Sequence, residues 1–479
     1  MAGKKIDEAD IQTNTKSKQI WWLAAFVIIF CSAMLYANHA DITEQYYDTK
    51  EYWNLANDIL YNGYDPIYIL RFPQTIRGYF FPMLVGYFKF FFDGIRGWRV
   101  LASLSLAACF SLSLPYAIRV RGINSLRELL RTLAAYAVFL WVWGNLMQYP
   151  LSDFPAFFFL ISAIALLRAA DLLRSIAAKA SMGFFVGVLL YAAYNTRPTF
   201  LYSILIIVPA YAFMNRKNGK SLVTVLITLL LGMTILALPQ CYINNRHEGS
   251  FSPKVFYNLM DSEVYRGIYT ARYETCTGNS PDYRSPELVF NDPVGRVILE
   301  REKLSVDDFR LTRIFDLFLK YPADMTGIYF RHLLSLLTPV YRDVYITDIY
   351  GIDIPLIIVS ILLWLTAGYG LLVQIKRKGL HLDAFFVLAV CIPGLLQIFD
   401  EPELRFFLPL YVLCYYYVFA VIDYRELASD FRKNWLPVLL ISLVLFIFWI
   451  NCTSSILTGN YTRPLLISDN SVYLADENQ

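Results

Sequence analysis

The sequence predicts an all-α fold: a polytopic integral membrane protein with about eleven transmembrane helices. Of its 479 residues, 57% are hydrophobic and 17% are charged, whereas soluble domains contain roughly 45–50% apolar and about 25% charged residues. The apolar residues are gathered into long runs with few charges, and Lys and Arg concentrate in alternate connecting segments. Both patterns are typical of helices that cross a bilayer, not of a soluble globular domain.

The first apolar run, 20–37, follows a polar segment that contains several lysines. This run is longer than the hydrophobic region of a signal peptide, and the residues at 37–41 form a poor cleavage site. We therefore expect a signal anchor with a cytoplasmic N-terminus, so that residue 38 emerges on the outer side. The other predicted spans are 98–118, 132–148, 153–168, 178–194, 199–214, 221–241, 353–375, 382–399, 406–422 and 436–451.

The apolar stretch 79–92 is too short to be a clear span. Its length corresponds to about 21 Å of helix, against a hydrocarbon core of roughly 30 Å. If it lies at the outer interface, the basic loops after residues 118, 168, 214, 375 and 422 all fall on the inner side. Counting it as a span would place them outside, against the positive-inside rule.

This topology divides the chain into three parts: an N-terminal membrane module, 1–241, which includes a first outer loop, 38–97; a large outer loop, 242–352; and a C-terminal membrane module with an outer tail, 353–479. The large loop is rich in Asp, Glu, Arg, Tyr and Asn. Short apolar patches such as 315–318 indicate that it folds on the membrane face and is not disordered.

Charge, cysteine pattern and motifs exclude several other classes. The 42 Lys+Arg against 39 Asp+Glu give a formal charge of +3, without the clustered basic face of a nucleic-acid binder. The seven cysteines form no CxxC pair, which argues against a zinc ribbon or a redox motif. Walker-type, HExxH and GxSxG motifs are absent, so ATP-driven transport, zincin proteolysis and esterase chemistry have no support.

The first outer loop is predicted to carry an amphipathic helix with an acidic side chain on it. Tyr52, Leu55, Ala56 and Ile59 recur at helical spacing, so this face could lie on the bilayer. Asp48 lies one turn before Tyr52 and shares its face. Its carboxylate, held over a membrane-level cavity, could take a proton from an incoming hydroxyl. The alternative is a helix-capping or solvated Asp.

Three further charges stand near span ends. Asp153 in a short outer loop is either functional or simply part of the first turn of a helix, before Pro155. Arg197, at an Asn-Thr-Arg-Pro break, requires an anion, a carboxylate or a lipid headgroup. Arg405 is shaped for bidentate contact with a phosphate. Its alternative is a salt bridge to Glu403 or to another nearby glutamate, at position 401.

These motifs resemble those of the GT-C glycosyltransferases of the bacterial inner membrane, the superfamily that includes protein O-mannosyltransferases and lipid A aminoarabinose transferases. Four features carry the resemblance: a DxxxY-type helix at 48–52, an LSD turn at 151–153, a TRP-like break at 196–198 and an ExR[FY]xxP stretch at 403–409. Their order and their shared outer placement cover most of the chain.

The resemblance implies a GT-C-like fold with interfacial helices on the outer face, such as 79–92. It also implies an active site on the periplasmic or outer face of a bacterial inner membrane. There the protein would transfer a hexosyl or pentosyl group, with inversion, from a polyprenyl-phosphate-linked donor. The acceptor would be a cell-envelope glycan or a lipid-linked saccharide, such as O-antigen or another part of lipopolysaccharide. Its partners would be this donor, the acceptor and membrane lipids, with no nucleic acid.

Residue by residue, the resemblance assigns the general base to Asp48, with Asp41 as its rival. The family often has two adjacent acids here, whereas Thr49 follows Asp48, so Glu51 also remains open. We expect Arg197 or Arg405 to hold the donor phosphate, because a guanidinium stabilises the charge that develops as the phosphate leaves. The other residues expected to bind substrate are Tyr52, Asp153 and Glu403. A divalent cation held by Asp41, Asp48 and Asp153 is an open question.

The rival function is that of a lipid-linked oligosaccharide polymerase or flippase, which would also have many spans and outer arginines. A flippase would carry charges that line a mid-membrane cavity, whereas most charges here are predicted at the outer surface. A non-enzymatic receptor is a third class.

Overall fold

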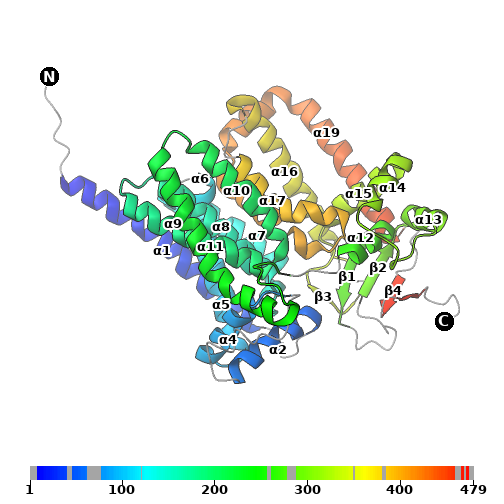
Figure 1. Cartoon of the computed structure of the whole chain (residues 1–479). Helices are drawn as coiled ribbons and strands as arrows, with labels where there is room; N and C mark the ends of the chain where they lie inside the picture. Colours follow the sequence, from blue (N-terminus) through cyan, green and yellow to red (C-terminus); the bar gives the residue numbers. More distant parts are fainter. Residues whose placement is uncertain are drawn as a thin grey trace. The chain divides into compact units, whose positions relative to one another are not determined.

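The computed structural model describes residues 8–39, 46–61, 77–119, 121–255, 260–277, 287–348, 351–379, 384–458, 465–468 and 471–473. In this part of the chain the fold is mostly helical (Figure 1), and the chain divides into two compact units. The first unit comprises Met1–Phe256, Leu382–Val390 and Tyr415–Val421. The second unit comprises Tyr257–His381, Cys391–Cys414 and Ile422–Gln479.

The first unit contains most of the helices. They are α1 (Glu8–His39), α2 (Tyr47–Tyr61), α4 (Phe80–Phe92), α5 (Ile95–Ala108), α6 (Leu114–Arg119), α7 (Leu126–Trp143), α8 (Asp153–Asp171), α9 (Ile176–Thr196), α10 (Leu201–Met214) and α11 (Gly219–Glu248). Two helices have residues in both units: α17 (Ala384–Leu396) and α18 (Leu408–Tyr416).

The second unit combines helices with short strands. They are α12 (Met260–Tyr269), β1 (Thr270–Cys276), β2 (Glu287–Asn291), α13 (Pro293–Glu302), α14 (Arg313–Lys320), α15 (Pro322–Leu336), β3 (Tyr345–Ile346), α16 (Ile354–Lys378), α19 (Tyr424–Thr458), β4 (Leu465–Ser468) and β5 (Ser471–Tyr473).

Nine helical segments of the described residues are long and apolar enough to cross a membrane. They are Ile20–His39, Ile95–Arg119, Leu126–Gln148, Asp153–Asp171, Ile176–Thr196, Gly219–Glu248, Ile354–Arg377, Leu404–Val421 and Tyr424–Leu457. The prediction of a helical, multi-pass membrane protein is thus confirmed. The predicted spans 199–214 and 382–399 correspond to shorter apolar helices, as does 79–92, so a count of about eleven crossings stays a prediction.

Close helix packing in the first unit depends on small residues. The helices α9 and α11 pack along each other, and a Cβ atom at Gly187 of α9 would lie 1.9 Å from the carbonyl oxygen of Leu229 on α11. Small residues at such positions let two membrane helices approach closely, because packing and not the hydrophobic effect joins helices within lipid. At the end of α9, Asn195 donates a hydrogen bond to Gln240 of α11, so the two helices are adjacent there as well.

The amphipathic helix predicted in that loop is α2, but its apolar face packs on protein. Tyr52, Leu55, Ala56 and Ile59 are all buried, and α2 lies against α4. The suggestion that this face could lie on the bilayer is therefore wrong. Periodicity predicts which face of a helix is apolar, but it does not say whether lipid or another helix covers that face.

The second unit departs from the all-α prediction, because it contains a five-stranded sheet among the described residues, in the order β3-β1-β2-β4-β5. The β1–β2, β2–β4 and β4–β5 pairs are antiparallel, and β1 and β3 run parallel. Strands of the large loop thus pair with strands of the C-terminal tail. This pairing requires both segments to lie on one side of the membrane, which agrees with the predicted topology.

The large loop is folded around its own core, as the sequence predicted. This core joins α12, α13, α14 and α15 through buried side chains such as Ile268, Phe309 and Met325. Charged side chains inside it are paired: Arg331 contacts Asp292 at 2.6 Å. Pairing of this kind lowers the cost of burying charge.

The predicted sidedness can be checked by cysteine labelling in intact cells. We expect Asn124→Cys, in the basic segment between α6 and α7, to react with a membrane-impermeant maleimide only after the membrane is permeabilised. Glu300→Cys, an exposed position on α13, is the matched control and should react directly with an outer reagent. The unsubstituted protein is the blank for the native cysteines, and the reverse labelling pattern would contradict the topology.

Candidate functional site

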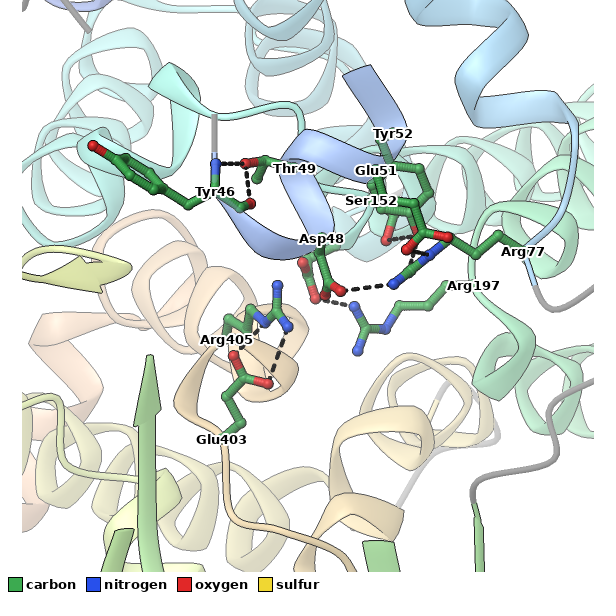
Figure 2. A network of polar contacts seen from close by, with 11 residues as sticks. Tyr46, Asp48, Thr49, Glu51, Tyr52, Arg77, Ser152, Arg197, Glu403 and Arg405 are labelled. Carbon is green, nitrogen blue, oxygen red and sulfur yellow. Dashed lines mark hydrogen bonds and ion pairs between the residues drawn. The ribbon is translucent and has the colours of Figure 1, made fainter. Parts of the chain in front are cut away.

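Asp48 lies in the first turn of α2, within the polar network drawn in Figure 2. The start of the helix is fixed by Thr49, whose hydroxyl accepts a hydrogen bond from the Tyr46 amide at 2.9 Å and donates one to the Tyr46 carbonyl at 2.5 Å. Because Thr49 ties this turn and α2 begins at Tyr47, Asp48 follows the capping position and does not occupy it. Its carboxylate points toward an arginine, as described next.

Arg77, which lies just before α4, joins three side chains of α2 (Figure 2). Its guanidinium contacts Asp48 at 2.7 Å and Glu51 at 2.6 Å, and it donates a hydrogen bond to the Tyr52 hydroxyl at 3.1 Å. Burial acts to lower the pKa of Arg77, but Tyr52, Asp48 and Glu51 together raise it above its ordinary value. The guanidinium is therefore a permanent cation. The side chain of Asp48 is still 32% exposed beside it.

A second ion pair forms where α8 begins and α9 ends. Asp153 is the first residue of α8, and Arg197 follows the last residue of α9 and precedes the 3₁₀ turn Pro198–Phe200. Their side chains form an ion pair in which Asp153 is 3% exposed. Of the partners considered for Arg197, a carboxylate is therefore present. Within the described residues, the second carboxylate oxygen of Asp153 has no hydrogen-bond partner.

One hydrogen bond, together with a peptide bond, connects the two ion pairs. The Tyr52 hydroxyl donates to Ser152 Oγ at 3.2 Å, and Ser152 precedes Asp153 in the chain. We call this network the α2–α8 polar cluster: Asp48, Glu51, Tyr52, Arg77, Ser152, Asp153 and Arg197. Three carboxylates and two guanidiniums meet there, all within the first unit and at the ends of two candidate spans.

A row of buried amide side chains holds the backbone beside both arginines. Asn195 accepts a hydrogen bond from the Phe80 amide at 2.9 Å and donates one to Gln240 at 2.9 Å. Gln240 in turn donates to Asn244 at 3.0 Å, and Asn244 donates to the carbonyl groups of residues 252 and 254, each at 2.6 Å. These three amide side chains are fully buried. The row fixes the segment before α4 against the end of α9.

Gly78 is the closest point of this contact, and it is next to Arg77. A Cβ atom at Gly78 would lie 1.9 Å from the Asn195 carbonyl oxygen, so any side chain must push the two backbones apart. We expect Gly78→Ala to lower the free energy of unfolding by about 1–3 kcal/mol, as other overpacked sites do. Gly219→Ala is the control, because no atom lies within 4 Å of its Cβ position. Thermal unfolding of both purified variants measures the difference, and equal stabilities would refute the tight contact.

Glu403 and Arg405 belong to the second unit and are described apart from the α2–α8 polar cluster. Arg405 Nε lies 2.5 Å from one Glu403 carboxylate oxygen, and a second guanidinium nitrogen donates to the other oxygen at 3.1 Å (Figure 2). The salt bridge considered as the alternative for Arg405 is therefore present, with Glu403 as its partner. Glu401 pairs instead with Arg266 at 2.8 Å. A role for Arg405 in phosphate binding stays a prediction.

Four of the predicted site residues thus meet in one cluster: Asp48, Tyr52, Asp153 and Arg197. Arg77 was not among the predicted site residues. The sequence does show a basic residue directly before the short apolar stretch 79–92. Arg197 was selected as a candidate because of a similar position beside an apolar segment. Asp41 lies outside the described residues.

Metal-binding side chains do not gather in the part of the chain that the structure describes: no three His, Cys, Asp or Glu residues there could hold an ion together. Protein-family models, curated proteins and solved structures were compared with the chain, and none of them matches it. The fold and the site define a helical, multi-pass membrane protein with a cluster of acidic and basic side chains at the ends of its spans.

Proposed function

We propose that the protein is a GT-C-type membrane glycosyltransferase. It transfers a hexosyl or pentosyl group from a polyprenyl-phosphate-linked donor to a cell-envelope glycan or lipid-linked acceptor, on the outer face of a bacterial inner membrane. The observation that carries the proposal is the partly exposed carboxylate of Asp48, which pairs with Arg77 and belongs to the same cluster as the Asp153–Arg197 ion pair at the ends of the candidate spans α8 and α9.

The position of the cluster suits a lipid phosphate. Span ends lie at the level of the headgroups, where a polyprenyl chain can stay in lipid while its phosphate reaches polar side chains and a water-borne acceptor approaches from outside. A glycosyl transfer needs a base for the acceptor hydroxyl and cations for the leaving phosphate. Asp48 offers the first, and Arg197 and Arg77 offer the second within one network.

Arginine would serve the phosphate because its planar fork matches two phosphate oxygens at once. Carboxylates contact these forks in the structure: Asp153 pairs with Arg197, and Asp48 and Glu51 pair with Arg77. A donor phosphate that replaced a carboxylate on Arg77 would also release Asp48 toward the acceptor. Glu403 and Arg405 remain proposed contacts to substrate and donor phosphate, respectively.

A divalent cation could assist through the oxygens of Asp41, Asp48 and Asp153. An EDTA titration of the transfer rate tests this point directly. If a cation takes part, turnover should fall as EDTA is added and return when magnesium or manganese is restored.

The decisive experiment uses the purified full-length chain in lipid vesicles with a labelled polyprenyl-phosphate sugar and an envelope-glycan acceptor. We expect a new glycosidic bond of inverted anomeric configuration, detected as label in the acceptor. Label that crosses the bilayer while no bond forms would instead support a flippase and would refute the proposal. Joining of repeat units that arrive on lipid carriers, with no use of single-sugar donors, would support a polymerase.

A further inference from the structure

The helix α14 of the second unit has an apolar surface wider than its core contact requires. Ile314 and Leu317 are buried in the core of the large loop, and Phe318 stacks on Tyr329 of α15 with ring centroids 5.4 Å apart. These contacts account for one side of α14. The other apolar side chains of the segment do not take part in them.

Those other side chains form a second, bare strip. Phe315 is 69% exposed and Leu319 is 84% exposed, and Leu311, in the turn before the helix, is exposed as well. Phe315 and Leu319 are four positions apart, so their side chains lie above one another on the helix. Leu311, in the turn before the helix, precedes Phe315 by another four positions. The exposed charged residues of the segment, Arg313 and Asp316, lie on another side of the helix. We call Leu311, Phe315 and Leu319 the α14 strip.

The neighbours of α14 connect it to a candidate membrane span. The next helix, α15, packs against α19, a candidate span. The ring of Phe330 on α15 lies 6.1 Å from that of Phe448 on α19, and Trp449 donates a hydrogen bond to Thr338, just after α15, at 2.8 Å. Both aromatic residues of α19 lie inside the apolar span. Because Phe318 of α14 stacks on Tyr329, the residue before Phe330, α14 packs on the part of α15 that contacts the candidate span.

We propose that the α14 strip inserts into the lipid leaflet next to the large loop, so that α14 acts as an in-plane membrane anchor for this part of the second unit. Large apolar side chains along one side and charged groups on another are what an interfacial helix presents to a bilayer. Lys320, whose ammonium contacts Glu302 at 2.5 Å, stands on the charged side, where water and headgroups meet. This proposal concerns lipid binding alone and does not rest on the glycosyltransferase assignment.

The test measures the depth of single labelled positions in the full chain. Phe315→Cys and Leu319→Cys carry a fluorophore that responds to polarity, and Asp316→Cys is the matched control on the charged side of the same helix. The proteins are reconstituted in phosphatidylcholine nanodiscs, and the labelled unsubstituted protein gives the signal of the native cysteines. Fluorescence is quenched either by spin-labelled lipid or by a water-soluble ion.

We expect the lipid quencher to act several-fold more strongly at positions 315 and 319 than at 316, and the aqueous quencher to show the opposite order. Equal access of the aqueous quencher to all three positions would overturn the proposal. Protection of 315 and 319 from both quenchers would also overturn it, because a second copy of the chain and not lipid would then cover the strip. Since all three positions are exposed, the variants should fold normally.

Discussion

Replacing Asp48 with asparagine is expected to lower the turnover of glycosyl transfer by a factor on the order of 10² to 10⁴, the usual contribution of a positioned general base. The acceptor hydroxyl must lose its proton as the bond to the anomeric carbon forms. A carboxylate is far too weak a base to ionise an alcohol beforehand, so it must accept the proton during displacement. The asparagine amide keeps the shape of the side chain but cannot accept that proton. Turnover of a labelled donor at equal amounts of reconstituted protein measures the loss.

The matched control for this change is Glu51→Gln. Both carboxylates contact Arg77, at 2.7 Å from Asp48 and 2.6 Å from Glu51, so both substitutions remove one charge partner of the same guanidinium. We expect Glu51→Gln to keep turnover within a few-fold of the unsubstituted protein. A severe loss in both variants would indicate that the cause is the altered position of the Arg77 guanidinium and not the loss of proton transfer.

The same substitution at Asp41 could contradict the assignment of the general base to Asp48. If Asp48→Asn stays active and Asp41→Asn is inactive, then Asp41 is the base and Asp48 is a positioning residue. If neither substitution lowers turnover, the carboxylates of the first outer loop do not take the proton. Membrane insertion of each variant, checked by the cysteine labelling described above, separates a chemical loss from a failure to fold.

The helices of this protein could be predicted because each crossing must satisfy its own backbone hydrogen bonds within lipid. Run length and charge therefore indicate where helices lie, and the spans 98–118 and 153–168 correspond to the helical segments Ile95–Arg119 and Asp153–Asp171. The partner of a helix is a different matter. The periodicity around Tyr52 predicted the buried face of α2, but α4 covers that face through contacts that no local pattern encodes.

The sheet of the second unit could not be predicted for a related reason. The strand β3 has only two residues, and β2 (Glu287–Asn291) pairs with β4 (Leu465–Ser468), which lies far from it in the sequence. Alternation of side chains is hard to recognise over so few residues, and pairing across such a sequence separation leaves no local signal. The site shows the same limit. Arg405 and Glu403 are two residues apart, so their salt bridge could be anticipated, whereas the contact between Asp48 and Arg77 depends on how α2 and α4 pack.

Removal of Arg197 is the second change with a large expected effect, because this side chain is proposed to do two things. It neutralises the buried carboxylate of Asp153, and it is a candidate for the donor phosphate. Arg197→Ala leaves the buried carboxylate without this cation, which costs about 3–5 kcal/mol where a buried pair is broken from one side. A loss of activity in this variant alone would therefore not distinguish a damaged fold from a lost contact.

The double substitution of Asp153→Asn with Arg197→Ala separates these effects. It removes both charges of the pair, so we expect most of the stability lost in Arg197→Ala to return, as measured by thermal unfolding of the purified protein. If Arg197 also holds the donor phosphate, the stable double variant should still lose transition-state stabilisation on the order of a few kcal/mol, as when other preorganised donors to an oxyanion are removed. Arg405→Ala tests the other candidate for the donor phosphate, which pairs with Glu403 in the second unit. Full activity in the double variant would exclude Arg197 from phosphate binding. Full activity in Arg405→Ala as well would exclude both arginines, and Arg77 would then be the remaining cation of the α2–α8 polar cluster to test against the donor.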